Sequence, residues 1–268
     1  MSSPLQAPDG DDSVAKVGVD FASRVLSRTG AGSPYFFRRA TTPADLHAAQ
    51  ALRFLVFNLE LNEGLESSYA TLRDEDPFDQ ACDHLLVEDK RTSEVVGTYR
   101  LQTGISAKER LGYYSAQEFD FAPLEPYRSL IIECGRACVH RDHRNLQVLS
   151  LLWRGIAEYT REHQARYLVG CSSLTSQDPA VGLAAYAVLK QEHLVAPEFR
   201  TTPIPACACT SPQIGPDAPK LPKLLRAYLS LGAKICGPPA IDREFKTIDF
   251  LTWLDIDELP DIARKLVE

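Results

Sequence analysis

The chain has 268 residues, of which 44% are hydrophobic and 24% charged, a balance that suits a globular protein with a buried core. Its formal net charge of -7 at pH 7 argues against a protein that coats nucleic acid. The longest strongly apolar stretch, residues 181–189, falls short of the roughly 18–20 residues that span a bilayer. A spanning helix and a nucleic-acid partner are therefore not expected.

The seven cysteines argue for reduced thiols rather than a metal centre. They contain no Cys-x-x-Cys pair, and no pair of histidines accompanies them at zinc-ligand spacing. Their odd number is typical of a cytoplasmic protein, as is a first stretch of twenty residues without a cationic start and an apolar block. We expect no bound metal.

Residues 1–34 are rich in Ser, Gly, Asp and Ala, and we expect a flexible tail ahead of one folded domain, residues 35–268. Apolar residues recur at helical spacing between positions 14 and 26. This segment could form a short amphipathic helix that rests on a membrane or on the domain. The favoured alternative is a frayed terminal helix.

In the first half of the domain, the residue pattern predicts strands on either side of an acidic loop, residues 74–79. Thr42 and Pro43 are an N-cap and first-turn signal, and the helix after them should end near residues 60–64. A polar turn, DKRTSE, separates two strand-like runs at hairpin distance, so we expect them to pair antiparallel. The predicted strands are 35–39, 84–88, 95–101 and 130–138.

The second half alternates helices with strands. Seven prolines predict an irregular insertion at about 197–222. Apolar spacing and stop signals predict helices at 149–159, 178–192 and 224–232, and strands at 167–170, 233–236 and 248–254. Together with the hairpin, this order predicts an α/β domain: a mixed sheet with helices on both faces.

The first candidate site joins the acidic loop to three arginines. Arg53, Arg100 and Arg136 fall on elements otherwise patterned for burial, and buried arginines need carboxylate partners. Asp76 and Asp79 of the loop can supply them. The network either fastens the loop to the sheet, which periodicity alone favours, or presents the same charges to a pocket.

The second candidate is Glu133, in the apolar run IIECGRACV, where a charged group is costly. In an ideal strand Arg136 would lie on the opposite face. Glu133 could be a carboxylate of raised pKa that takes a proton from an attacking amine, directly or through water. It could equally be an ion-paired strand residue.

The third candidate is the turn 139–145, which carries Arg141, His143 and Arg144 just ahead of a helix. Basic side chains and helix N-terminal amides together can hold a phosphate. The turn contains no glycine, and the alternative is a basic turn that serves solubility.

Four motifs occur in one order along the chain: RFLVF at 53–57, EDPFD at 75–79, GTYRL at 97–101 and ECGRACV at 133–139. In this order they resemble GNAT-fold acyltransferases that take a fatty acyl chain from acyl carrier protein: the acyl-homoserine-lactone synthases and the ornithine-lipid N-acyltransferases. Residues 84–89 and 231–255 look more similar to the latter, the lyso-ornithine lipid synthases, often labelled hemolysin-like. The resemblance covers residues 35–257.

The resemblance implies a GNAT-like α/β fold with a mixed, mostly antiparallel central sheet flanked by helices on both faces. It also implies a catalytic cleft, with Glu133 as the proposed base and Arg100 and Arg136 paired with the acidic loop. One of these arginines could instead bind the carboxylate of the acceptor. The implied catalytic residues are Glu133, Arg136, Arg100, Asp76 and Asp79, and Arg53 and Phe57 are implied to bind substrate.

The acyl chain needs an apolar tunnel, and Phe119, Phe121 and Trp153 are candidates for its wall, although such residues are more often core. Tyr228 is a further candidate for substrate contact. Its hydroxyl could protonate the departing thiolate, and packing is the alternative.

The acyl donor is expected to be acyl carrier protein rather than acyl-CoA. Acetyl-CoA-using members of the fold carry a glycine-rich pyrophosphate turn where this chain has RDHRNLQ, and a carrier's phosphopantetheine thioester needs no such turn. The donor is then a substrate, and no cofactor is held. The expected carrier-binding residues are Arg141, His143, Arg144 and Arg154, with Lys220, Lys223 and Arg226 as a second group.

The resemblance therefore implies direct transfer of a long-chain, optionally 3-hydroxylated, fatty acyl group to the α-amine of an amino acid, with L-ornithine as the leading acceptor. Backbone N–H groups of parted central strands would stabilise the tetrahedral oxyanion. The alternatives are acylation of glycine or another amine, synthesis of an acyl-homoserine lactone, and, third, a non-enzymatic hemolysin-like membrane protein. A cytoplasmic enzyme with a peripheral contact to the inner membrane face fits the leading function.

Overall fold

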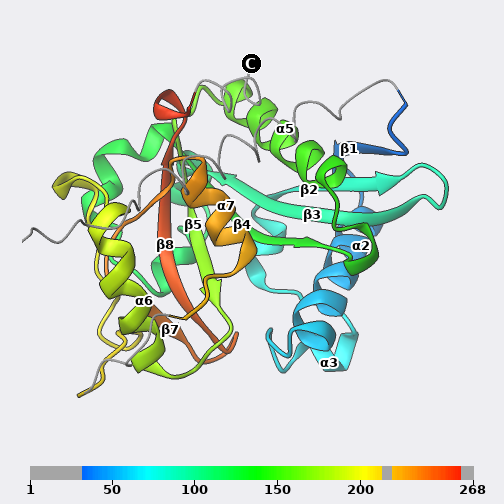
Figure 1. Ribbon diagram of the computed structural model, residues 1–268. Helices are drawn as coiled ribbons and strands as arrows, with labels where there is room; N and C mark the ends of the chain where they lie inside the picture. The colour runs from blue at the N-terminus through cyan, green and yellow to red at the C-terminus, as the bar shows by residue number, and fades with distance from the viewer. Residues whose placement is uncertain (1–31, 213–218, 261–268) are drawn as a thin grey trace, which may run out of the picture.

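The computed structural model describes residues 32–212 and 219–260, and residues 1–31 of the predicted tail, with its segment 14–26, lie outside them. Within these residues an eight-stranded sheet runs in the order β1-β2-β3-β4-β5-β8-β6, with β7 paired to β8 (Figure 1). The strands are β1 (Tyr35–Arg39), β2 (Asp83–Asp89), β3 (Glu94–Thr103), β4 (Ile131–Val139), β5 (Tyr167–Leu174), β6 (Lys234–Ile235), β7 (Ala240–Asp242) and β8 (Thr247–Asp255).

The pairing of the strands is antiparallel everywhere except between β4 and β5. That parallel pairing is short, since Ile131 to Glu133 of β4 pair with Tyr167 to Val169 of β5 and the later residues of the two strands do not. The sheet therefore parts in its middle. The predicted mixed, mostly antiparallel GNAT-like sheet is confirmed.

Helices cover both faces of the sheet, as predicted. One face carries α2 and α4, and the other carries α5, α6 and α7 (Figure 1). The α-helices are α2 (Pro43–Phe54), α3 (Ser68–Thr71), α4 (Gly104–Glu109), α5 (Leu146–Glu162), α6 (Pro179–Glu192) and α7 (Lys223–Ser230), and a π-helical segment, η1, spans Leu55–Glu60. The 3-10 helices are η2 (Pro77–Gln80), η3 (Tyr114–Gln117), η4 (Ala122–Leu130), η5 (Arg141–His143), η6 (Pro197–Phe199) and η7 (Ile256–Glu258).

Local sequence signals explain where α2 begins. The Thr42 side chain accepts a hydrogen bond from the backbone N–H of Asp45, whose own carboxylate accepts one from the N–H of Thr42. This capping box and the Pro43 that follows fix the first turn. The helix continues as η1 to Glu60, within the predicted stop region.

Alternation along the strands sends side chains to two separate cores. Leu101, Ile132 and Leu168 pack with α5 on one face of the sheet. Ile131 and Val169, their neighbours along the same strands, pack on the other face with α4 and η4. Because β4 and β5 part beyond these residues, a cavity can connect the two faces there.

The predicted strands and long helices are confirmed, and the sequence missed the short elements. It gave no indication of α3, α4 or β7, each of six residues or fewer. Residues 219–222 and 200–212 of the predicted insertion have no helix or strand, although isolated bridges tie Pro203 to Phe119 and Ala208 to Ala240. Among the described residues, no helix combines the length and the hydropathy needed to cross a membrane.

Candidate active site

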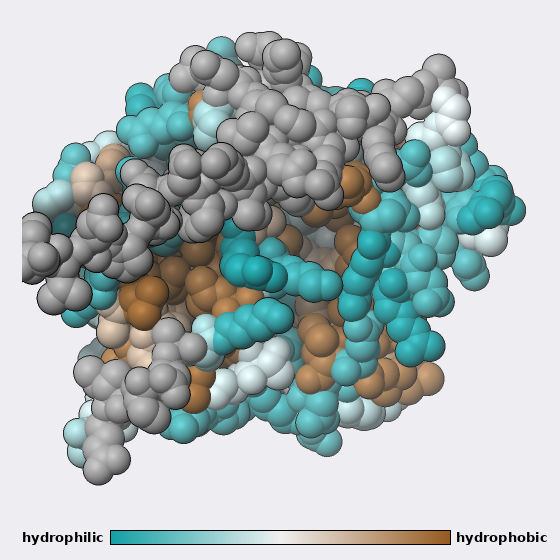
Figure 2. All heavy atoms as spheres, viewed as in Figure 1, coloured by the Kyte–Doolittle hydropathy of each residue, from teal (hydrophilic) through white to brown (hydrophobic). Residues whose placement is uncertain are grey.

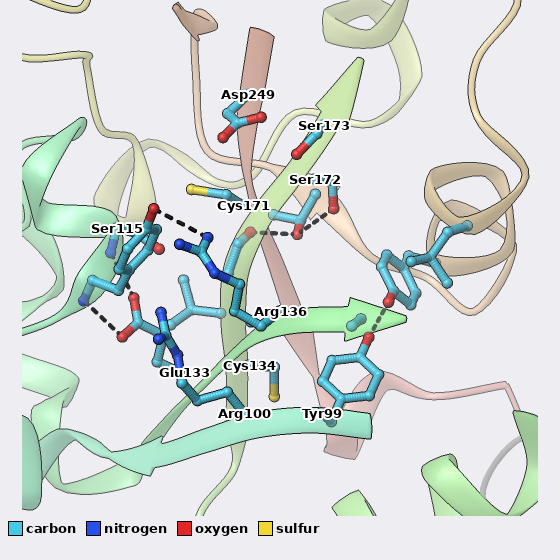
Figure 3. A pocket seen from close by; sticks show the side chains of 18 of the residues that line it. Tyr99, Arg100, Ser115, Glu133, Cys134, Arg136, Cys171, Ser172, Ser173 and Asp249 are labelled. Atoms are coloured by element: carbon cyan, nitrogen blue, oxygen red, sulfur yellow. Dashed lines mark hydrogen bonds between the residues drawn. The ribbon is translucent and has the colours of Figure 1, made fainter. Parts of the chain in front are cut away.

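A cavity of about 330 Å³ opens where β4 and β5 part. Its walls include Cys134 to Arg136 of β4 and Gly170 to Ser172 of β5. Figure 3 shows a tyrosine pair on one side of the parted strands and Glu133 and Arg136 on the other. The cavity therefore has an apolar side and a charged side, one on each face of the sheet.

The apolar side is lined by residues of α5, α7 and the strands they cover. Figure 2 shows hydrophobic residues gathered on this face near α6 and α7. The lining residues there include Tyr99, Leu101, Trp153, Ile156, Leu168, Leu225, Tyr228 and Leu254. A long acyl chain would bury apolar surface against such a wall.

The hydroxyls of Tyr99 and Tyr228 form a hydrogen bond with each other at the apolar side. Trp153 packs edge-on against the Tyr228 ring, with ring centroids 5.9 Å apart. Burial raises the pKa of both phenols well above 10. Such a phenol is a far weaker acid than a thiol, which makes full proton transfer from Tyr228 to a departing thiolate unfavourable, and that role stays a prediction. A hydrogen-bond donor is the role that fits.

On the charged side, backbone amides and one side-chain amide hold Glu133 in place. Its Oε1 accepts a hydrogen bond from the N–H of Ser115 at 2.8 Å. Its Oε2 accepts from the N–H of Tyr114 at 2.9 Å and from Nε2 of Gln102 at 2.6 Å. Each carboxylate oxygen can accept two bonds, so Oε1 keeps capacity for one more. Glu133 lines the cavity although it is only 4% exposed.

Arg136 lies on the same face as Glu133, which corrects the prediction from ideal alternation. Arg136 has a φ of 49°, and the register of β3 against β4 shifts between Thr98 and Arg100. The extra residue in β4 is a β-bulge, which turns the next side chain to the other face. The guanidinium then reaches the hydroxyl of Tyr114 at 3.1 Å and packs over the ring of Phe245.

The acidic loop binds all three predicted arginines. Asp76 forms salt bridges with Arg100 at 2.6 Å and with Arg136 at 3.0 Å. Asp79 forms them with Arg53 at 2.5 Å and with Arg100 at 2.9 Å. The predicted ion pairing is confirmed.

The network does both things that the sequence suggested: some of its residues fasten the loop to the sheet, and others present charge to the cavity. Arg100 and Arg136 line the cavity, whereas Arg53, Asp76 and Asp79 are not among its lining residues. Burial acts to raise the pKa of Asp79, but the charges of Arg53 and Arg100 outweigh it and hold that pKa well below its usual range. The two aspartates therefore position arginines that line the cavity, and a direct catalytic role for either aspartate stays a prediction. Arg53, predicted to bind substrate, is likewise enclosed with Asp74 and Asp79.

The aromatic residues predicted to bind substrate divide in the same way. Phe57 and Trp153 line the cavity. Phe119 and Phe121 instead lie in the core that α4 and η4 cover, 2% and 6% exposed, and not in the cavity wall. Their apolar character is explained by this core, since Phe121 stacks on Tyr113 with centroids 4.5 Å apart.

The predicted basic group does not reach the cavity, because Arg141, His143, Arg144 and Arg154 are absent from its lining. Arg144 forms a bidentate pair with Glu60, at 2.6 and 2.8 Å. Nδ1 of His143 lies 3.0 Å from the Tyr35 hydroxyl. The residues stay on the surface, Arg141 with 73% of its side chain exposed.

The N-terminus of α5 is capped from within the chain. The side chain of Asn145 accepts hydrogen bonds from the N–H groups of Gln147 and Val148, at 3.0 and 3.2 Å. These are among the amides that a bound pyrophosphate would otherwise need. The geometry agrees with the absence of a glycine-rich turn.

Sequence reasoning missed a group of buried acids on the charged side, formed by Glu118 and Asp249. Asp249 lines the cavity and is 4% exposed. Burial raises the pKa of Asp249 to about 6, and burial together with the charge of Asp249 raises the pKa of Glu118 to about 10. Each group therefore makes the other harder to ionise, so the pair holds a proton more tightly than two separate carboxyl groups would.

Comparisons with known proteins agree with this fold. The acetyltransferase (GNAT) domain family matches residues 52–154. Among solved structures, the CoA-dependent acyl-homoserine lactone synthase BjaI, with SAM and isopentyl-CoA, superposes with a TM-score of 0.50 at 14% identity, covering 87% of each chain. The AHL synthase LasI gives the same TM-score and identity, over 87% of this chain and 95% of its own.

Curated relatives are similar over most of the sequence. An L-ornithine N(alpha)-acyltransferase from Brucella abortus (strain 2308) is 33% identical over 237 residues, which cover 83% of this chain and 84% of that protein. One from Rhizobium meliloti (strain 1021) is 32% identical over 83% of this chain and 80% of its own length. With the parted sheet, the arginine-bound acidic loop and identity at this level, the chain belongs to the L-ornithine N(alpha)-acyltransferase family.

Proposed function

We propose that this protein transfers a long-chain fatty acyl group from acyl carrier protein to the α-amine of L-ornithine. The single observation that carries the proposal is the cavity through the parted sheet, because it brings an apolar wall and a set of fixed charges to one point. A thioester and an amine entering from opposite faces would meet between β4 and β5. The relatives' shared activity on L-ornithine supports this choice of acceptor.

In this mechanism the neutral α-amine attacks the thioester carbonyl carbon, and a tetrahedral intermediate forms. Beyond Glu133, β4 has no pairing with β5, which leaves backbone N–H groups available to the oxyanion. The C–S bond then breaks and the amide remains. The thiolate takes up the proton that the amine has lost, so the transfer needs no acyl-enzyme.

Glu133 is the proposed general base. Its free Oε1 capacity would accept the amine proton, directly or through one water, while the three amide donors keep the carboxylate fixed. The hydroxyl pair of Tyr99 and Tyr228 would donate a hydrogen bond to the departing sulfur.

Arg136 is the proposed partner of the acceptor's α-carboxylate. Arg100 already donates to two aspartates through its Nη1. Arg136 lines the cavity and is held from behind by Asp74 and Asp76, at 3.2 and 3.0 Å. A guanidinium fixed in this way can still bind a carboxylate with its remaining N–H groups.

Acyl carrier protein is the proposed donor because the structure offers little to a CoA pyrophosphate. Asn145 caps α5, and Arg144 is committed to Glu60. A carrier would instead contact exposed basic side chains such as Arg141 and Arg154. No tightly held cofactor is part of the proposal.

The donor is tested by comparing kcat/KM for palmitoyl-carrier protein and palmitoyl-CoA with saturating L-ornithine. We expect the carrier to be favoured at least about tenfold, and Arg141→Glu to lower kcat/KM for the carrier alone. Glu198→Gln, at an exposed site on η6, is the matched control. Equal use of both donors would overturn the carrier proposal and leave the acyl transfer in place.

We also propose a peripheral membrane contact, because the product is an amphiphile. Two exposed leucines, Leu61 and Leu224, line the cavity. Leu55 and Leu59 on η1, and Leu72 just after α3, are also exposed. Sedimentation with anionic vesicles should be reduced in Leu59→Glu/Leu72→Glu, and unchanged sedimentation would argue against the contact.

A further inference from the structure

The charged side of the cavity contains a carboxylate that the proposed mechanism does not use. Asp249 lies on β8 directly across from Ser173 of β5, and both line the cavity. In Figure 3 they lie at the end of β5 away from Glu133. Glu118 and Cys171 lie beside Asp249, with ligand atoms of all three within 4.8 Å of one another.

Two oxygen atoms of this group have no partner. Oδ1 of Asp249 and Oε2 of Glu118 are buried without a hydrogen bond. Among the described residues, Asp249 forms no salt bridge; Arg136 acts on it as a nearby charge, and the side chains of Ser173, Thr247 and Glu118 are its polar neighbours. A buried, ionised oxygen without a partner is costly unless a ligand supplies the donor.

We infer that Asp249, with Glu118 behind it, binds the side-chain ammonium group of the acceptor, so that the cavity selects a diamino acid. The inference rests on the proposed function and identifies the residues that recognise the second amine. An ammonium group offers three N–H donors and a positive charge, which match an acidic pair that forms no salt bridge with a cation of the described chain.

The spacing along β5 suits an amino acid of this size. Gly170 marks the point where β4 and β5 part, and the proposed reaction takes place beside it. Ser173, which faces Asp249, is three residues further, or about 10 Å along the strand. An extended ornithine spans about 6 Å between its two nitrogens. The rest of the distance is taken up by the Asp249 side chain and one hydrogen bond of about 2.8 Å.

The charges around Asp249 support a cation that arrives with a carboxylate. Asp242 and Glu63 also line the cavity, so the far end of the charged side is acidic. Arg136 is the cation at its near end. A zwitterion with a cationic side chain would place its carboxylate at Arg136 and its second amine at Asp249.

A metal ion is the other cation that Glu118, Cys171 and Asp249 could hold. The Cys171 thiol donates its S–H to Oε1 of Glu118, with the two atoms 3.9 Å apart. A metal ion would have to displace that proton to take the sulfur as a ligand. An ammonium group needs only the carboxyl oxygens.

The wild-type protein provides the first test. Initial rates are measured with acyl-carrier protein and either L-ornithine or L-norleucine, in which a methyl group replaces the ammonium. We expect kcat/KM for ornithine to exceed that for norleucine by at least about a hundredfold. Comparable acylation of both would overturn the inference and leave the transfer reaction standing, whereas acylation of neither would mean that the proposed function fails.

Variants test whether Asp249 is the residue that gives the preference for ornithine over norleucine. Asp249→Asn should lower the ornithine preference by about a hundredfold, through KM for ornithine, and leave kcat/KM for norleucine within about threefold. Glu118→Gln should keep most of the preference, since the amide retains an acceptor oxygen and Asp249 retains its carboxylate. The control is Glu198→Gln, and circular dichroism checks the fold of each variant.

Other outcomes would contradict the inference. An equal fall of kcat with both acceptors in Asp249→Asn would make Asp249 a base instead. Loss of wild-type activity on chelation, restored by Zn²⁺ alone, would make the group a metal site. If Asp249→Asn fails to fold, the ratio of kcat/KM for ornithine to that for norleucine in the wild type still tests whether the cavity selects a diamino acid.

Discussion

Glu133 and Arg136 are three residues apart on β4 and both bind Tyr114. The carboxylate accepts from the Tyr114 N–H at 2.9 Å, and the guanidinium donates to the Tyr114 hydroxyl at 3.1 Å. An unbroken strand would send the two side chains to opposite faces. The bulge at Arg136 therefore gathers the proposed base and the proposed carboxylate-binding group on one side of the cavity.

Glu133→Gln should lower kcat by about 10²–10⁴-fold, the usual effect of losing a general base. The new amide replaces one carboxylate oxygen with an NH2 group, which then opposes either the Ser115 N–H or the donors of Tyr114 and Gln102, so some stability is lost too. Stopped-flow release of the carrier thiol measures the rate. A folded variant with near-normal kcat would remove Glu133 from the role of base.

Arg53→Met should lower the free energy of unfolding by about 3–5 kcal/mol, because it leaves Asp74 and Asp79 buried without their main cation. Arg91→Met, which breaks an ion pair in which the Arg91 side chain is 71% exposed, should cost at most about 1 kcal/mol. Urea unfolding of both variants measures the difference. Equal losses would mean that the buried network does not fasten the acidic loop.

Gly170→Ala should destabilise the protein by about 1–3 kcal/mol or more. A Cβ at Gly170 would lie 2.0 Å from the carbonyl oxygen of Cys134, across the point where β4 and β5 part. Gly135→Ala is the matched control, since its Cβ would meet no atom within 4 Å. Thermal unfolding compares them, and a Gly170→Ala protein as stable as Gly135→Ala would contradict the close approach of the strands.

The pKa of Asp249 makes stability depend on pH with a definite sign. Burial raises this pKa from 3.8 to about 6, so the folded state binds the proton more tightly than the unfolded chain. The protonated form contributes stability below about pH 4, and this contribution is lost as the pH rises through about 6.

Asp249→Asn mimics the protonated form, so its gain in unfolding free energy over the wild type should be larger at pH 7 than at pH 4. Urea unfolding at the two pH values measures the gain, and Glu198→Gln should show no such change. Ornithine binding should follow the opposite trend, with KM falling as the pH rises from 5 to 7. A gain that is the same at both pH values would contradict the raised pKa.

The sequence predicted those parts of the fold that local patterns specify. The Thr42 cap, the hairpin around the polar turn and the Gly232 that ends α7 each leave a signal within a few residues. The pairing of the arginines with the acidic loop was also predictable. Arginines on apolar elements need carboxylate partners, and the acidic loop provides several carboxylates in one short segment.

The remaining features depend on contacts between distant parts of the chain. An isolated glycine, Gly135, precedes the bulge at Arg136 and was its one local signal, but strict alternation assigned that side chain to the wrong face. Asp249 lies in the apolar run of β8, and only folding brings it to Glu118. Phe119 and Phe121 carry the same sequence signal as a tunnel wall, and packing alone distinguishes the two.

The central claim is acyl transfer to the α-nitrogen of L-ornithine within the parted sheet. The direct test incubates the purified wild-type protein with acyl-carrier protein and L-ornithine labelled with ¹⁵N at the α position, and tandem mass spectrometry then locates the acyl group. The expected product carries the acyl chain on the labelled nitrogen. An acyl chain on the δ-nitrogen, or no acylated ornithine at all, would contradict the claim.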